Sequence, residues 1–334
     1  MTPLLGVTTP NTQWRTWTHE EEAALLDLRP QALLVLGYPV PPDNPDLVEL
    51  QRAQIEQAAR LWRALGRPRF YLRPYGDRIL QRPPLDWSFE CYVLVQRYKA
   101  AGIQGLELIP WNEPNLAGEG GGEDWERVVL WETACAADLK MRLPGTRLHR
   151  PAFSPTGGYV RGFQKRQVRQ PPGLFEIDDA HVYTDDQIAD VEYINSGSGL
   201  PVCITEWNRL VPSALVAALP EYCEAAVYFI LRWDRPEPGV PVVDLIGWEY
   251  YEDFKAAAAG ALPPQEVGEM ALVDQYPEQF SQWQAAGGVE NNFRKHLLGI
   301  GVLAPEAADL LFLAQELGSG IQQLRGVLDA YPFP

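Results

Sequence analysis

The chain has 334 residues, of which 46% are hydrophobic and 22% are charged, as is ordinary for a soluble globular protein. A chain of this length buries a core that needs no disulfide or metal to stabilise it. The formal net charge is −16, so nucleic acids and anionic membrane surfaces are poor partners. No stretch approaches the ~20 apolar residues that a transmembrane helix needs.

The cysteines lie in apolar contexts and form no closely spaced pair: Cys91, Cys135, Cys203 and Cys223. This pattern is typical of small buried side chains in a reducing compartment. The histidines are scattered and no cluster has metal-ligand spacing, so we expect no metal and no cofactor. The first residues, MTPLLGVTTP, lack the features of a signal peptide, and a cytoplasmic location is expected, with export by another route left open.

Short apolar segments alternate with amphipathic segments through most of the chain. The predicted strands are 4–8, 32–37, 70–74 and 106–109, and then segments near 148–153, 180–183, 202–205 and 226–233. Helices are predicted between them, and the first of these begins after Thr18, a plausible N-cap with Glu21 three residues later. The alternation predicts repeated β–α units around a parallel sheet.

Eight strands with intervening helices fit an α/β fold of the (β/α)8 TIM-barrel type, which we expect over residues 1–261. An open doubly wound sheet is the alternative, but no glycine-rich phosphate-binding turn follows the first strand. A proline-rich loop is predicted over residues 235–254. Residues 262–334 exceed what the eighth helix needs, and we expect them to form a helical C-terminal extension that packs on the barrel.

Two of the predicted strands lead into a glutamate. The segment IPWNEPN, residues 109–115, places Glu113 between an asparagine and a proline, and CITEWN, residues 203–208, places Glu206 at the end of the seventh strand. In a barrel both glutamates emerge at the C-terminal face, where barrel enzymes keep their catalytic groups. Paired carboxylates suit glycoside hydrolysis, in which one carboxyl group is protonated and the other is ionised.

Four further side chains are candidates to complete this site. Arg73, at the end of the third strand, is expected to hold Glu206 ionised through a charge-assisted hydrogen bond. His181 and Tyr183 lie two residues apart and therefore on one side of the sixth strand. Tyr183 is expected to donate to the nucleophile and His181 to bind a sugar hydroxyl. Trp233, which closes the eighth strand, is expected to form a flat floor for a sugar ring.

Each of these features alone also fits a structural role: a polar turn, a surface arginine, a core histidine or a core tryptophan. Further aromatic residues are weaker candidates for the sugar platform: Trp111, Trp207, Trp248, Tyr250 and Tyr251. The loop AGEGGGED, residues 117–124, is too acidic to cradle phosphate and is interpreted as a mobile connection beside the site.

Together these motifs resemble the clan A retaining glycoside hydrolases, the (β/α)8 group that includes family 5 cellulase-like and family 39 xylosidase-like enzymes. The resemblance spans roughly residues 1–260 and rests on NEP, TEW, HVY and Trp233. It implies that Glu113 is the acid/base, Glu206 the nucleophile and Asn112 a ligand of the sugar 2-hydroxyl. The third strand shows YLRPYGD where family 5 members commonly carry a histidine, so no single family within the clan is assigned.

The resemblance therefore implies a retaining glycosidase that cleaves O-glycosidic bonds of an oligo- or polysaccharide by double displacement, without a cofactor. A transglycosylase on the same site and a catalytically silent barrel that binds glycan or protein remain alternatives. A lyase or aldolase is disfavoured, because the lysines fall in predicted helices or loops rather than at strand ends. The sugar and the oligomeric state are not predicted.

Overall fold

The computed structural model describes residues 3–12, 14–41, 43–119, 121, 124–155, 159–184, 187–208, 210–233 and 244–261. The predicted C-terminal extension, residues 262–334, lies outside these residues. The strands are β1 (Leu4–Thr8), β2 (Ala32–Gly37), β3 (Arg69–Pro74), β4 (Glu107–Leu108), β5 (His149–Arg150), β6 (Ile177–Val182), β7 (Val202–Trp207) and β8 (Cys223–Tyr228). The α-helices are α1 (His19–Leu28), α2 (Pro45–Ala64), α3 (Pro84–Ala100), α4 (Trp125–Arg142), α5 (Tyr159–Arg169), α6 (Ile188–Ser198), α7 (Pro212–Ala218) and α8 (Tyr251–Ala261).

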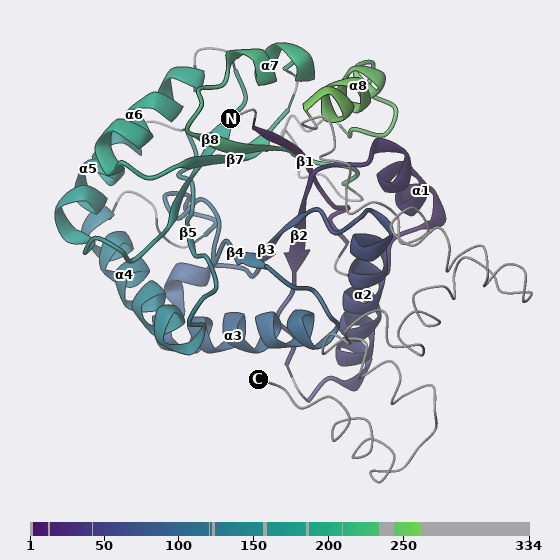
Figure 1. The fold of residues 1–334 in the computed structure, drawn as a ribbon. Helices are drawn as coiled ribbons and strands as arrows, with labels where there is room; N and C mark the ends of the chain where they lie inside the picture. Colours follow the sequence, from purple (N-terminus) through teal and green to yellow (C-terminus); the bar gives the residue numbers. More distant parts are fainter. Residues whose placement is uncertain are drawn as a thin grey trace, which may run out of the picture. The chain divides into compact units, whose positions relative to one another are not determined.

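The strands form one parallel sheet in the order β4-β3-β2-β1-β8-β7-β6-β5. A parallel bridge between Leu108 and Leu148 joins β4 to β5 and closes the ring. Figure 1 shows the strands in the centre and the helices arranged around them. The predicted (β/α)8 fold is confirmed, and all C-terminal strand ends therefore share one rim.

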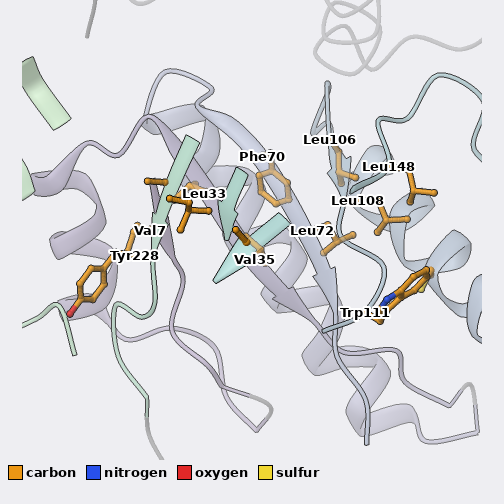
Figure 2. Close-up of a cluster of buried hydrophobic side chains, with 14 of the residues drawn as sticks. Val7, Leu33, Val35, Phe70, Leu72, Leu106, Leu108, Trp111, Leu148 and Tyr228 are labelled. Atoms are coloured by element: carbon orange, nitrogen blue, oxygen red, sulfur yellow. The ribbon is translucent and has the colours of Figure 1, made fainter. Parts of the chain in front are cut away.

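The outward faces of the strands pack against the helices. Leu33 and Val35 of β2 belong to a large buried cluster with Phe70 and Leu72 of β3 (Figure 2). Burial of each such side chain contributes about 1.5–3 kcal/mol to stability. The start of helix α1 is fixed locally, because Thr18 and Glu21 form the predicted capping box there.

The aromatic residues Trp111 and Trp207 are part of this outer layer. Both side chains are fully buried, and Trp207 packs against Tyr228 and Phe254. Trp248 and Tyr251 also pack on the outer cluster. The prediction that Trp111 and Trp207 extend a sugar platform is therefore wrong, because both rings are buried in the outer layer. For Trp207 the reason is local: it follows the inward Glu206 in β7, so its side chain points to the helices.

The inside of the barrel holds a buried ionic network. The ring of His149 lies between two carboxylates, with Nδ1 2.6 Å from Asp179 and Nε2 3.0 Å from Glu107. Arg69 donates to both oxygens of Glu107, at 2.5 and 3.0 Å. We call Arg69, Glu107, His149 and Asp179 the inner cluster. All four side chains are at least four-fifths buried, so their charges must compensate one another.

The inner cluster shifts the ionisation of its members strongly. Burial by itself lowers the pKa of His149, but the two carboxylates more than offset this and raise it to about 9. Burial by itself raises the pKa of Glu107, but hydrogen bonds from His149 and Arg69 lower it to about 2. At neutral pH the cluster therefore contains a charged imidazolium held between carboxylates.

The eighth strand differs from its prediction. Strand β8 ends at Tyr228, whereas the apolar run was expected to continue as a strand to Trp233. Beyond Tyr228 the backbone makes irregular bonds: the N–H of Phe229 donates to Trp207 (2.8 Å), and that of Leu231 donates to Thr8 (3.0 Å). The apolar composition of this segment predicted that it is largely buried. It could not predict that the hydrogen-bond pattern of the strand becomes irregular after Tyr228.

The structure also tests the predictions for the segment before α8 and for the cysteines. Helix α8 begins at Tyr251, inside the predicted proline-rich loop 235–254. The four cysteines are buried and free, as predicted. Across the described residues, no helix combines the length and the apolar character needed to cross a membrane.

Candidate active site

The segment after β4 carries Glu113 in an unusual backbone conformation. Strand β4 ends at Leu108, and Glu113 has φ +30°, a left-handed value that L-residues seldom adopt. The following Pro114 adds to the strain, because a residue before proline favours extended conformations. Strain of this kind collects at functional sites, where the surrounding structure fixes a side chain in place.

Glu206 is directed inward by an irregularity in β7. The register runs from Cys203 opposite Asp179 to Glu206 opposite His181, so that the strand gains one residue over its partner β6. Without this bulge, strict alternation from the inward Cys203 would direct Glu206 toward the helices. The bulge therefore places Glu206 on the inner face of the barrel.

The two glutamates meet around His181. The imidazole Nδ1 lies 2.8 Å from Glu113 Oε1 and 3.7 Å from Glu206 Oε2. One ligand atom from each of the three residues lies within 4.8 Å of the others. The prediction that Glu113 and Glu206 open onto one face is thus matched by the structure. His181 lies between them, although the sequence suggested only contact with a sugar hydroxyl.

Glu206 is held by two donors. The hydroxyl of Tyr183 donates to Oε2 at 2.6 Å, and Arg73 forms an ion pair with Oε1. Burial by itself raises the pKa of Glu206, but the charges of His181 and Arg73 and the hydrogen bonds from Tyr183 and Arg73 outweigh it, so that the pKa is lowered. Glu206 is therefore stabilised as a carboxylate.

Tyr183 remains a donor over the whole useful pH range. Burial raises its pKa well above 10, and the negative charges of Glu206 and Glu113 act in the same direction. We call Arg73, Glu113, His181, Tyr183 and Glu206 the active-site cluster. Glu113 is its most accessible carboxylate, with 13% of its side chain exposed against 5% for Glu206.

The structure places the remaining predicted site residues at the same rim. Asn112 is half-buried beside Glu113. Trp233 lies five residues beyond β8, is half-buried, and forms a bridge with Asn11, which follows β1. Its ring meets that of Phe229 edge-on, with centroids 5.6 Å apart. Sugar binding by Asn112 and Trp233 stays a prediction.

Sequence reasoning missed other residues at this rim. Phe229 directly follows β8, in the place where Trp233 was expected. Trp14, in the loop after β1, exposes 65% of its surface. Glu119 lies in the acidic loop that was interpreted as a mobile connection. The available indication for Glu119 was an acidic residue within a glycine-rich loop. Nothing in the local pattern distinguished Trp14 or Phe229 from ordinary core residues.

Two groups of side chains in the described part bring possible metal ligands together. One is Glu113, His181 and Glu206, and the other is His149, Asp179 and Cys203. The second group fits a metal poorly, because a ring protonated up to a pKa of about 9 has no lone pair to offer. In the first group, the His181 nitrogen already lies at hydrogen-bond distance from Glu113.

No family model matches the chain, and no curated protein matches it in sequence. Solved structures with a similar fold include a GH39 β-xylosidase from Caulobacter crescentus, with a TM-score of 0.55, 15% identity, and coverage of 77% of this chain and 71% of that one. A glucosidase from Croceicoccus marinus has a TM-score of 0.53 at 9% identity, covering 78% and 68%. An exo-β-1,4-mannosidase from Opitutaceae bacterium strain TAV5 has a TM-score of 0.51 at 14% identity, covering 77% and 60%.

These neighbours share the (β/α)8 fold with the chain. The barrel fold that the motifs implied is thus shared with solved glycoside hydrolases. At 15% identity or less, the likeness concerns the architecture alone. What the site does must be argued from its own side chains.

Proposed function

We propose that the chain is a retaining glycoside hydrolase, with Glu206 as the nucleophile and Glu113 as the acid/base. The observation that carries this proposal is the convergence of the two glutamates at the C-terminal rim in unlike surroundings. Arg73 and Tyr183 both bond to Glu206, whereas Glu113 is more accessible and contacts His181. Unlike environments are what separate an ionised carboxylate from a proton-donating one.

The spacing of the two carboxyl groups supports retention of configuration. Retaining enzymes place them about 5–5.5 Å apart, and inverting enzymes about 6.5–9.5 Å apart to leave room for a water molecule. One pair of oxygen atoms from Glu113 and Glu206 lies within 4.8 Å, which brings the two carboxyl groups close together and is consistent with the retaining spacing.

The reaction then proceeds in two displacements. A carboxylate oxygen of Glu206 attacks the anomeric carbon while Glu113 gives its proton to the departing glycosidic oxygen. The bond between sugar and leaving group breaks as the glycosyl ester with Glu206 forms. Glu113, now ionised, takes a proton from water, and the resulting attack on the ester releases the sugar with net retention.

His181 and Tyr183 have separate tasks in this scheme. Tyr183 donates to Glu206 Oε2 and leaves Oε1 with Arg73, so the attacking carboxylate has a fixed orientation. His181 contacts Glu113 through Nδ1 and so orients the acid/base. Fixing the geometry of both carboxyl groups reduces the freedom that must be lost in the transition state.

The experiment uses 4-nitrophenyl β-glycosides of xylose, glucose and mannose, the sugars named by the structural neighbours. Wild type is expected to hydrolyse at least one of them, with the β-anomer appearing first by proton NMR. Glu206→Gln should lower kcat by a factor on the order of 10⁴ or more in a variant that still folds, as its thermal unfolding transition checks. A first-formed α-anomer, or near-wild-type turnover by Glu206→Gln, would refute the mechanism.

The same samples separate the alternatives. Added xylose, glucose or mannose that is incorporated into longer products in preference to water would show transglycosylation through the same ester. A barrel that binds these sugars but turns over none of them would be a silent binder. The lysines of the described residues, Lys99, Lys140, Lys165 and Lys255, lie in helices, which gives no support to a Schiff-base enzyme.

A further inference from the structure

The loop that follows Glu113 closes back on its own beginning. The N–H of Leu116 donates to the carbonyl of Glu113 (2.9 Å), and that of Gly121 donates to Leu116 (3.3 Å). Gly121 lies so close to Pro114 that an added Cβ would come within 1.6 Å of the Pro114 carbonyl oxygen. This closed turn keeps Glu119 near the acid/base.

The backbone around Glu119 is anchored to the neighbouring loop. Its carbonyl accepts a hydrogen bond from the N–H of Leu80 (3.0 Å), in the 3-10 helix Ile79–Gln81 that precedes α3. Arg127 of α4 donates to the carbonyls of Leu80 (3.1 Å) and Gly121 (2.9 Å). Glu119 therefore has a defined position rather than that of a free loop tip.

The carboxyl group of Glu119 has an unused polar atom within the electrostatic reach of the active-site cluster. Its Oε2 is buried and has no hydrogen-bond partner among the described residues. The charges that act on the group are those of Glu113, Glu206 and Asp77, which oppose its ionisation, and of Arg73, which favours it. A buried polar atom without a partner is costly and calls for one, such as a bound ligand.

We propose that Glu119 is a substrate-contacting residue of the proposed glycosidase site, where its carboxyl group hydrogen-bonds a hydroxyl of an uncharged sugar and the surrounding carboxylates reject anionic sugars. This inference rests on the proposed function and gives it a substrate class: neutral glycosides rather than uronides. In this proposal the sugar hydroxyl is the hydrogen-bond partner that the buried Oε2 of Glu119 lacks.

The ionisation of Glu119 agrees with this role. Burial, followed by the negative charge of Glu113, raises its pKa to about 8, so that at neutral pH the group is protonated and can donate. A sugar carboxylate placed there would meet Glu206 and Asp77 as well. The positive charge of Arg73, which also acts on Glu119, is already balanced by Glu206, to which its Nη1 is paired.

The test compares wild type with Glu119→Gln and Glu119→Ala on the 4-nitrophenyl β-glycosides of xylose, glucose, mannose and glucuronic acid. The amide of Glu119→Gln can still donate and accept, so KM for the neutral substrate should stay within about threefold of wild type at pH 6.5. Glu119→Ala should raise KM roughly tenfold to a hundredfold while kcat changes less. Wild type should turn over the glucuronide at least about a hundredfold less efficiently than the best neutral substrate.

A pH profile separates donation by Glu119 from a merely structural role. In wild type, KM for the neutral substrate should rise between pH 7 and 9 as Glu119 ionises, whereas KM of Glu119→Gln should stay level. Glu56→Gln makes the same substitution on the exposed face of α2 and should leave KM unchanged throughout. Thermal unfolding of each variant confirms that it is folded.

Failure of this inference differs from failure of the proposed function. Hydrolysis that requires Glu206 but shows wild-type KM in Glu119→Ala overturns the role of Glu119. Preference for the glucuronide overturns the substrate class. If wild type hydrolyses none of the neutral glycosides, or does so independently of Glu206, the proposed function falls and the inference falls with it.

Discussion

The barrel contains two histidines that each lie between carboxylates. They differ in how many of their ring nitrogens have a hydrogen-bond partner. In the inner cluster both ring nitrogens of His149 are engaged, by Asp179 and Glu107. In the active-site cluster His181 uses Nδ1, while its Nε2 is buried without a hydrogen-bond partner among the described residues. Both nitrogens of His149 are thus occupied, although Oδ2 of its partner Asp179 is buried without one, whereas His181 keeps a nitrogen for a ligand.

The same contrast holds for the arginines of β3. Arg69 donates two hydrogen bonds to Glu107 and a third to Glu224. Arg73 pairs with Glu206 through Nη1, and its Nε and Nη2 are buried without partners among the described residues. Similar residue types thus have two roles. Arg69 is more fully paired and stabilises the barrel, whereas Arg73, near the rim, keeps donors that a ligand can use.

The largest effect should follow from removing Glu113, the proposed acid/base. Glu113→Ala should lower kcat/KM on alkyl or sugar-linked glycosides by about 10²–10⁴, because their leaving groups need the proton. A 2,4-dinitrophenyl glycoside needs no proton for departure, so its first step should slow far less. Burst kinetics measure the two steps separately. Equal loss on both substrates would mean that Glu113 does not act as the acid.

Breaking the inner cluster should instead cost stability. Glu107→Gln leaves Arg69 and His149 without a full counter-charge in a buried place, and we expect unfolding to become easier by about 3–5 kcal/mol. Urea unfolding measures this loss. The folded fraction should retain wild-type kcat and KM. A large kinetic defect with unchanged stability would show that the two clusters do not divide structure from chemistry.

The sequence predicted much of the barrel because local patterns report local structure. The place of Arg73 at the end of the third strand predicted its pairing with Glu206, and the period of two along β6 placed His181 and Tyr183 on one side. The inner cluster was not predicted, because its partners lie 30 to 42 residues apart on different strands. Only the closed ring brings them together.

The parts of the site that were missed depend on backbone detail. The bulge that turns Glu206 inward leaves no mark in composition, since the segment reads as an uninterrupted strand. The closed turn that fixes Glu119 depends on Gly121 approaching Pro114, in a loop whose glycines suggested mobility. In β7 a register shift of one residue decides that Glu206 reaches the site. In the loop the close contact between Gly121 and Pro114 decides where Glu119 lies.

A pH effect on stability should reveal the inner histidine. The folded-state pKa of His149 is raised from 6.5 to about 9, so its protonation stabilises the fold fully below about pH 6.5. This contribution, about 3 kcal/mol, should be lost as the pH rises through 9. The difference in unfolding free energy between wild type and His149→Gln should therefore be larger at pH 6 than at pH 9.5. The exposed His19→Gln serves as control, and a difference independent of pH would contradict the prediction.

The smallest of these effects concerns a single hydroxyl group. Tyr183→Phe removes the 2.6 Å hydrogen bond to Glu206, worth about 1.5–3 kcal/mol because its acceptor is charged. Since that bond lowers the pKa of Glu206, its loss should move the acidic limb of kcat/KM to higher pH and reduce the plateau roughly tenfold to a hundredfold.

Tyr71→Phe is the matched control, because Tyr71 lies inside the same barrel with its ring 5.3 Å from that of His149. Removal of its hydroxyl should leave the acidic limb in place. A shift in both variants would mean that the two clusters act as one electrostatic unit, and the distinction between the inner cluster and the active-site cluster would then fail. A shift in Tyr183→Phe alone would show that the lowered pKa of the nucleophile is built locally, by the donors that touch it.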